Sequence, residues 1–173
     1  MFSSIKNDYS HVLPYFVDGV VSKGFGRGSK ELGIPTANIN QEVIEKLPKD
    51  LDCGIYYGFA KVNNSPLYKA VLSIGWNPFY QNDKKSLEAH ILHNFEGDFY
   101  GANLKLVILG HIRPERDFLS VEDLINEIKN DIRNLVFVEF MMTVLGLTSV
   151  FTDNTLCSIC LCTYKINATC VFI

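Results

Sequence analysis

The chain has 173 residues, of which 47% are hydrophobic and 20% are charged, a balance typical of a globular protein with a core of its own. Its net charge of −3, from 16 basic and 19 acidic side chains, excludes a broadly basic nucleic-acid-binding protein, because no surplus of cations is present to neutralise phosphates. The apolar content also excludes an acidic disordered chain, and the twelve Phe and eight Tyr suit a β-rich core.

Short β-rich segments separated by turn-forming residues predict five strands. The expected strands are 16–23, 53–62, 67–74, 87–95 and 103–112. The second and third are joined by Asn-Asn-Ser-Pro, a turn composition, so we expect them to form a hairpin. The last is an almost continuous apolar run, which indicates a well-buried strand. Residues 42–47 can form at most a short helix before Pro48.

The fourth expected strand alternates between two faces. Leu87, Ala89 and Ile91 share one face, and Glu88 and His90 share the other. A glutamate on such a strand can act as a general base if it reaches a hydroxyl, or it can be an outward-facing charge in solvent. For a histidine on a β face, we favour a packed or hydrogen-bonded role over a catalytic one.

Residues 120–135 give the clearest helical signal. Ser120 is a good N-cap, and Asp123 follows three residues later, as in a capping box. The apolar stripe consists of Val121, Leu124, Ile125, Ile128, Ile132 and Leu135. A run of strands joined by turns, followed by one helix, favours an antiparallel barrel with a C-terminal helix over a parallel α/β sheet.

The composition changes after about residue 135, which divides the chain into a body, 13–135, and a hydrophobic tail, 136–173. The tail holds four of the five cysteines. These are Cys157, Cys160, Cys162 and Cys170. Their spacing matches no common zinc pattern, so we favour free or buried thiols over a metal cluster.

The run 135–151 is apolar, with Glu139 as its one charge, but it is shorter than the roughly 20 residues that a spanning helix needs. We therefore favour a helix packed on the body, with a tail-anchored membrane form as the alternative.

The N-terminus lacks the apolar region of a signal peptide, and a body with Cys53 alone fits a reducing compartment. We expect a cytoplasmic protein, with a mitochondrial location as an alternative.

Residues 24–38 form a loop with four glycines and two cations. Gly24, Gly26 and Gly28 let backbone N–H groups approach an anion, and Arg27 and Lys30 add positive charge. The spacing fits neither a phosphate-binding P-loop nor a dinucleotide fingerprint. An ordinary glycine-rich turn is the alternative.

Two further segments carry polar groups suited to ligand binding. In Pro-Thr-Ala-Asn, the side chains of Thr36 and Asn38 point to the same side of an extended segment, and hard oxygen ligands beside phosphates suit Mg²⁺. Turn stabilisation is the alternative. The loop 113–118 combines cations with an aromatic ring, so it can hold a planar ligand or serve as a connector.

Taken together, the motifs resemble the riboflavin kinase (flavokinase) family of the monofunctional eukaryotic type, over roughly residues 13–134. They are GFGRGSKELGIPTAN, GIYYG, SIGWNPFY, SLEAHILHNF, DFYG and IRPERDF, in this order. The resemblance implies a six-stranded antiparallel Greek-key barrel with a C-terminal helix. It also implies transfer of the γ-phosphoryl group of ATP to the 5′-hydroxyl of riboflavin, making FMN. The resemblance further implies a requirement for a divalent cation, Mg²⁺ or alternatively Zn²⁺ or another divalent ion.

The resemblance also implies roles for individual residues. Glu88 matches the catalytic carboxylate, and Thr36 and Asn38 match the metal-binding positions. The expected ATP-binding residues are Gly24, Lys30, Thr36, Ile91, His93 and Tyr100. The expected flavin-binding residues are Arg113, Arg116 and Phe118. Partners would be riboflavin or FMN and ATP or ADP, with no nucleic acid, no membrane attachment through the tail, and a monomeric state.

The resemblance ends after Asn134, where family members continue the helix with charged residues and finish in a polar tail. Here the chain continues as VFVEFMMTVLGLTSVF and ends in the cysteine-rich segment. In the family, the C-terminal helix helps to close the flavin site. The alternative function is therefore a catalytically impaired isoform that binds flavin or nucleotide but closes its site poorly.

Overall fold

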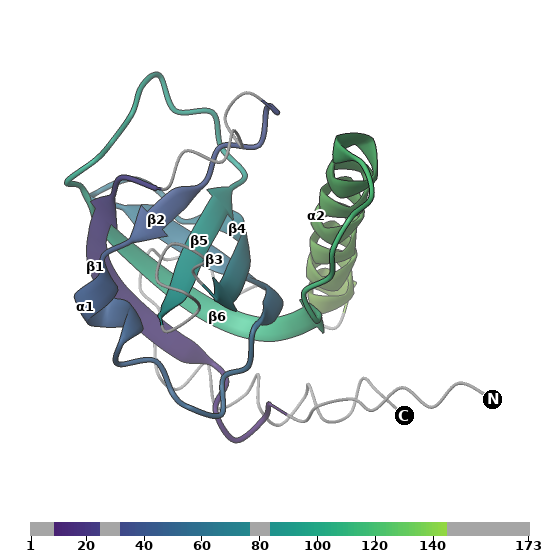
Figure 1. Cartoon of the computed structure of the whole chain (residues 1–173), viewed down its shortest axis with the longest axis horizontal. Helices are drawn as coiled ribbons and strands as arrows, with labels where there is room; N and C mark the ends of the chain where they lie inside the picture. Colours follow the sequence, from purple (N-terminus) through teal and green to yellow (C-terminus); the bar gives the residue numbers. More distant parts are fainter. Residues whose placement is uncertain (1–8, 25–31, 77–83, 145–173) are drawn as a thin grey trace.

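The structure is a computed structural model that describes residues 9–24, 32–76 and 84–144 (Figure 1). Its strands are β1 (Tyr15–Ser22), β2 (Ala37–Ile39), β3 (Gly54–Val62), β4 (Tyr68–Trp76), β5 (Lys85–Ile91) and β6 (Asn103–Arg113). Its helices are the short α1 (Gln41–Ile44) and the long α2 (Val121–Val144). The strands curl around one core, and α2 stands beside the barrel (Figure 1).

The six strands close into an antiparallel barrel in the order β1-β2-β5-β4-β3-β6, with β6 paired back to β1. This confirms the expected mainly β fold with a C-terminal helix. The strand that the hydrophobic pattern did not predict is β2, which lies in the Pro-Thr-Ala-Asn segment. It has only three residues, all buried, so its length is too short for any alternation to be seen.

The predicted hairpin is present as β3 and β4, which pair from Gly54↔Ile74 to Ala60↔Tyr68. Asn63 in its turn has a φ of 50°, a left-handed conformation that Asn tolerates better than most residues. The expected strand 87–95 is wrong at its end, because β5 stops at Ile91. There the backbone N–H of His93 donates to the Ile91 carbonyl, which turns the chain away from the sheet.

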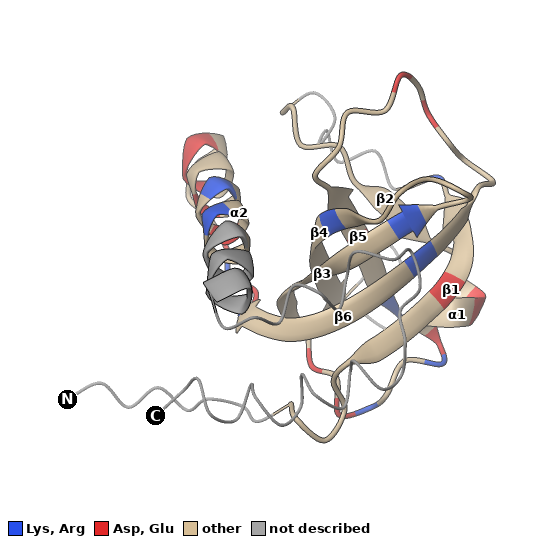
Figure 2. Cartoon of the chain, turned by 180° about the vertical axis from the view of Figure 1, so that it is seen from behind, with Lys and Arg blue, Asp and Glu red and all other residues tan. Residues whose placement is uncertain are grey.

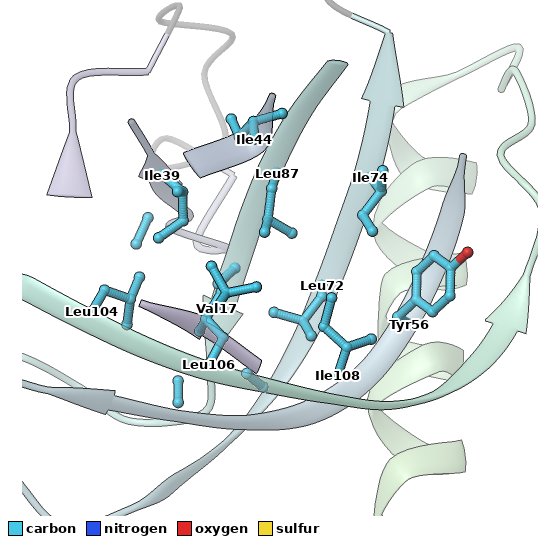
Figure 3. Close-up of a cluster of buried hydrophobic side chains, with 14 of the residues drawn as sticks. Val17, Ile39, Ile44, Tyr56, Leu72, Ile74, Leu87, Leu104, Leu106 and Ile108 are labelled. Carbon is cyan, nitrogen blue, oxygen red and sulfur yellow. The ribbon is translucent and has the colours of Figure 1, made fainter. Parts of the chain in front are cut away.

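Inward-facing side chains from all six strands fill the barrel (Figure 3). The labelled members include Val17, Ile39, Tyr56, Leu72, Ile74, Leu87, Leu104, Leu106 and Ile108. In β5, Leu87, Ala89 and Ile91 are buried whereas Glu88 and His90 are half-buried, as the alternation predicted.

The pairing of β3 with β6 contains register shifts between Ile55 and Tyr56 and between Tyr57 and Gly58. A Cβ on Gly58 would overlap the Val107 carbonyl, so the backbones approach there to a distance that only glycine permits. On the other face of β6, Val107 and Leu109 pack with Tyr57 and Phe59 in a smaller cluster. Both faces of the middle of β6 are therefore apolar, which explains its continuous hydrophobic sequence.

Helix α2 begins as predicted. The Ser120 hydroxyl oxygen accepts a hydrogen bond from the Asp123 backbone N–H at 3.1 Å, and the same hydroxyl donates to the Asp123 carboxylate at 2.7 Å. Val121, expected in the apolar stripe, is 56% exposed, so the covered part of the stripe begins one turn later. The helix runs beyond residue 135 to Val144. Figure 2 shows both signs of charge along it.

Among the described residues, no helix is both long enough and apolar enough to cross a membrane. The four tail cysteines and residues 145–151 of the apolar run lie outside the described residues. The division into a body and a tail therefore stays a prediction.

Candidate active site

The centre of the candidate site is a direct contact between β5 and the segment that leads into β2. The Thr36 hydroxyl donates a 3.0 Å hydrogen bond to Oε2 of Glu88. Asn38 lies opposite Glu88 in the β2–β5 ladder, and residues opposite each other in an antiparallel pair share one face. The structure therefore brings Thr36, Asn38 and Glu88 together, although 50 residues separate Asn38 from Glu88 in sequence.

Gly24, the first glycine of the predicted phosphate loop, lies against this group. A Cβ at position 24 would overlap Nδ2 of Asn38, so glycine lets the loop backbone reach the Asn38 carboxamide. Asn38 itself is only 9% exposed. A hydroxyl oxygen, a carboxamide oxygen and a nearby carboxylate are the hard oxygen donors that Mg²⁺ prefers, so the residues present fit a magnesium ion.

The turn that carries Tyr100 is attached to the same end of the barrel. The Gly101 N–H donates to the Val21 carbonyl, and the Val21 N–H donates to the Ala102 carbonyl, both at 2.9 Å. The next residue of β1, Ser22, pairs with Asn38. Tyr100 is 55% exposed, so its ring is available to a ligand near this edge.

Two other residues expected to bind nucleotide follow Glu88 along the chain. Ile91 is only 5% exposed and belongs to the core. His93 stacks on Tyr68, with ring centroids 4.0 Å apart and planes inclined by 12°. Phe95 meets both of these rings edge-on. The rings thus form an aromatic group just beyond the end of β5.

The residues expected to bind flavin surround the start of α2. Arg113 is 9% exposed, and its Nε and Nη2 donate to the two carboxylate oxygens of Asp131 at 3.0 and 2.8 Å. Glu127 contacts both Arg113, at 3.4 Å, and Arg116, at 3.1 Å. The Phe118 ring lies 5.8 Å from the Arg113 guanidinium. The pairing therefore fastens the end of β6 to α2 and positions the intervening loop.

That loop also reaches the strand pair that carries Glu88. The Glu115 carboxylate lies against Gly75, where a side chain on residue 75 would overlap it. Gly75 pairs with Ser86, and Ser86 precedes Glu88 by two residues on β5. The expected flavin loop therefore approaches Glu88 from one end of β5, and the expected nucleotide residues gather around Glu88 and beyond the other end.

The titratable groups with shifted pKa values belong to a different cluster, formed by β3, β6 and the N-terminal segment. The rings of Tyr9, Tyr56 and His111 contact one another, with centroids 5.0–5.9 Å apart. Burial raises the pKa of Tyr56 above its usual range and lowers the pKa of His111, which Asp52 partly offsets. Burial also raises the pKa of the nearby Cys53 thiol. Tyr9 donates to Asp52 at 3.0 Å, which fixes the segment before β1.

Sequence reasoning missed Asp131 and gave His90 no specific partner. Asp131 is 2% exposed, and it lies seven residues after Leu124 on the helix face that is otherwise apolar. A carboxylate at such a position requires a cation partner, and that signal could have identified it. His90 contacts the Pro35 carbonyl, which no sequence pattern indicates. Lys30 lies outside the described residues.

The fold and this constellation define a class of protein, a small antiparallel β-barrel with a carboxylate beside a hydroxyl and a carboxamide side chain. Comparison with known proteins identifies the family. A sequence profile for flavokinase, described as riboflavin kinase, matches residues 11–137. This chain belongs to the riboflavin kinase family.

Individual relatives agree with that assignment. The human protein named riboflavin kinase is 56% identical over 120 residues, which are 69% of this chain and 77% of that protein. The mouse riboflavin kinase is 55% identical over the same shares of the two chains. Among solved structures, riboflavin kinase from Trypanosoma brucei superposes with a TM-score of 0.60 at 30% identity, covering 80% of this chain and 85% of that chain.

Proposed function

We propose that this chain transfers the γ-phosphoryl group of ATP to the 5′-hydroxyl of riboflavin, making FMN and ADP, with Glu88 as the general base. Family membership supports the overall reaction. The observation that carries the residue assignment is the position of Glu88. It contacts Thr36, pairs with Asn38, and lies on β5 between the flavin-side loop and the aromatic group that includes His93.

The reaction needs a base because the attacking group is a neutral alcohol. The riboflavin 5′-oxygen forms a bond to the γ-phosphorus, the bond from that phosphorus to the β–γ bridging oxygen breaks, and ADP leaves. Glu88 takes the hydroxyl proton, so charge and atoms balance. Phosphoryl transfer depends mainly on positioning and charge stabilisation, and a positioned base contributes about 10²–10⁴-fold.

Thr36 and Asn38 would hold a divalent cation, for which we propose Mg²⁺ rather than Zn²⁺, since the donors are oxygens and no thiolate or imidazole is among them. A bound cation would neutralise charge on the phosphate oxygens. The Thr36 hydroxyl donates its hydrogen to Glu88, and the oxygen of a hydroxyl is also an acceptor of the kind that a cation ligand needs. Gly24 gives backbone access beside Asn38.

The other expected ligand-binding residues are assigned to two sides of Glu88, one for the nucleotide and the other for flavin. We assign Gly24, Lys30, Ile91, His93 and Tyr100 to the nucleotide side. Because Ile91 is buried in the core, it would support the wall of the site rather than contact much of the nucleotide. On the other side, we assign Arg116 and Phe118 to flavin contacts and Arg113 to holding their loop, since Asp131 occupies two of its nitrogens.

A binding-only isoform is the competing function, and the intact Thr36–Glu88 contact disfavours it. The full chain incubated with riboflavin, ATP and Mg²⁺ should form FMN, resolved from riboflavin by fluorescence-detected chromatography. Omitting ATP or chelating the cation should each abolish the product. Riboflavin binding by the folded chain without FMN formation would support the binding-only isoform instead.

We also propose a cytoplasmic location. The free thiol of Cys53, the only cysteine among the described residues, fits a reducing compartment. Fractionation of cells with and without detergent tests this, because recovery only in the detergent extract would contradict it.

A further inference from the structure

His90 contacts the proposed cation-binding segment, residues 35–38, which lies beside Glu88. Both residues lie on the outward face of β5, two positions apart. Glu88 accepts a hydrogen bond from the Thr36 hydroxyl at 3.0 Å, and Nδ1 of His90 lies 2.9 Å from the carbonyl oxygen of Pro35. Two adjacent residues of the cation-binding segment are thus each held by one side chain of β5.

The histidine contact begins where the backbone ladder stops. β2 pairs with β5 at Asn38↔Glu88 and Ala37↔Ala89, and the pairing does not continue to residues 35 and 36. Pro35 has no backbone N–H to donate, so it cannot extend a ladder in the usual way. The His90 side chain takes the place of the next ladder bond and holds the segment against β5.

The contact also determines which ring nitrogen carries the proton. A carbonyl oxygen only accepts hydrogen bonds, so Nδ1 must be the donor. In the neutral ring, Nδ1 then carries the hydrogen and Nε2 does not. This tautomer is a spectroscopic property of the contact that can be measured independently of catalysis.

We propose that His90 is a positioning residue for the phosphoryl-transfer reaction. By holding the Pro35 carbonyl, it fixes the backbone immediately before Thr36 and so positions the Thr36 hydroxyl, which would be a cation ligand, against Glu88. This inference rests on the proposed function. Because His90 acts on the cation-binding segment and not on the reacting atoms, its loss should weaken cation use more than it slows turnover at saturating cation.

The test uses the full chain and three substitutions. His90→Ala removes the donor, whereas His90→Asn places an amide N–H near the position of Nδ1. His11→Ala is the matched control, since His11 is an exposed histidine whose ring lies 3.8 Å from Asp50, before β3. FMN formation is measured against Mg²⁺ concentration at saturating riboflavin and ATP, with thermal unfolding of each variant recorded to show that it is folded.

His90→Ala should raise the half-saturating Mg²⁺ concentration about three- to tenfold, the range for one ordinary hydrogen bond, and change kcat at saturating Mg²⁺ by less than about threefold. His90→Asn should restore most of the cation affinity, and His11→Ala should match the unsubstituted chain. Equal cation dependence in His90→Ala and the unsubstituted chain would overturn the proposal, as would equal impairment of His90→Ala and His90→Asn.

Nitrogen-15 NMR of the imidazole gives an independent readout. The Nδ1–H tautomer of His90 is expected, and the Nε2–H tautomer would overturn the proposal even with the proposed function intact. Conversely, an unsubstituted chain that forms no FMN would overturn the proposed function together with the positioning role of His90. The two failures are therefore distinguishable.

Discussion

Two polar pairs connect distant parts of this chain, and they differ in burial. The Thr36–Glu88 hydrogen bond lies on the half-buried outer face of β5. The Arg113–Asp131 ion pair is enclosed between β6 and α2, with side chains 10% and 3% exposed. The first pair places a hydroxyl and a carboxylate side by side on a half-buried face. The second joins the helix to the barrel. An ion pair such as Arg113–Asp131 is therefore not in itself evidence of a catalytic site.

The difference has an energetic cause. A buried charge that loses its partner retains its full cost of desolvation, whereas a group at a solvated edge regains hydrogen bonds to water. Substitutions in the enclosed pair should therefore act on folding, and substitutions in the half-buried pair should act on catalysis.

The largest change in stability is expected for Asp131→Ala. It removes the two-hydrogen-bond partner of the buried Arg113 guanidinium and leaves only the longer contact with Glu127, so the free energy of unfolding should fall by about 3 kcal/mol. Denaturant titration of the full chain measures this. Arg116→Ala is the control, because Arg116 is 54% exposed and its contact with Glu127 should contribute less than about 1 kcal/mol. Similar losses in the two variants would remove the distinction between enclosed and exposed pairs.

A smaller effect, on activity rather than folding, is expected for Thr36→Val. The substitution removes the donor to Glu88 and one cation ligand, so FMN formation at subsaturating Mg²⁺ should fall by about tenfold or more. Stability should change by less than about 1 kcal/mol, because the site is half-buried. Thr36→Ser keeps the hydroxyl and should retain most of the activity. If Thr36→Ser were as impaired as Thr36→Val, the hydroxyl would not be the group that matters.

The N-cap of α2 should contribute less again. Ser120→Ala removes the acceptor for the Asp123 N–H and should lower the free energy of unfolding by about 1 kcal/mol, whereas Ser120→Thr keeps a hydroxyl and should lose less. Chemical denaturation of both variants provides the comparison. An unchanged denaturation midpoint in Ser120→Ala would show that the first turn of α2 does not unfold cooperatively with the rest of the protein.

The smallest effect is the pH dependence from His111. Burial lowers its pKa in the folded chain below the unfolded value of about 6.5, so the unfolded chain binds the proton more readily. The stability contribution of neutral His111 is fully present above about pH 6.5 and is lost as the pH falls below it. His111→Phe should flatten the stability profile between pH 7 and pH 5. A profile as steep as that of the unsubstituted chain would assign the pH dependence to other groups.

The sequence predicts most of the barrel because its strands are long and apolar enough to show alternation, as β5 does around Leu87 and Ala89. It also predicts that Thr36 and Asn38 share a side, since this follows from the geometry of an extended segment. The strand β2 was not predicted, because three buried residues carry no period. The expected strand 87–95 was too long, since a local turn after Ile91 is not visible in a hydrophobic pattern.

Long-range partners could not be predicted from the pattern alone. The resemblance placed Arg113 at the flavin, but its pairing with Asp131 depends on how α2 lies against the barrel. The His90 contact with Pro35 likewise depends on the register of β2 against β5, which two ladder pairs determine. Both are properties of packing between elements rather than of either segment by itself.

The most direct test of Glu88 as the base is the single-turnover rate of FMN formation by the Glu88→Gln variant, measured with enzyme in excess over riboflavin at saturating ATP and Mg²⁺. Glutamine keeps the shape and can still accept the Thr36 hydrogen bond, but it cannot take up the proton. We expect the rate to fall by about 10²–10⁴-fold, with riboflavin affinity and unfolding free energy nearly unchanged. A single-turnover rate within a few fold of the unsubstituted chain would contradict the role assigned to Glu88.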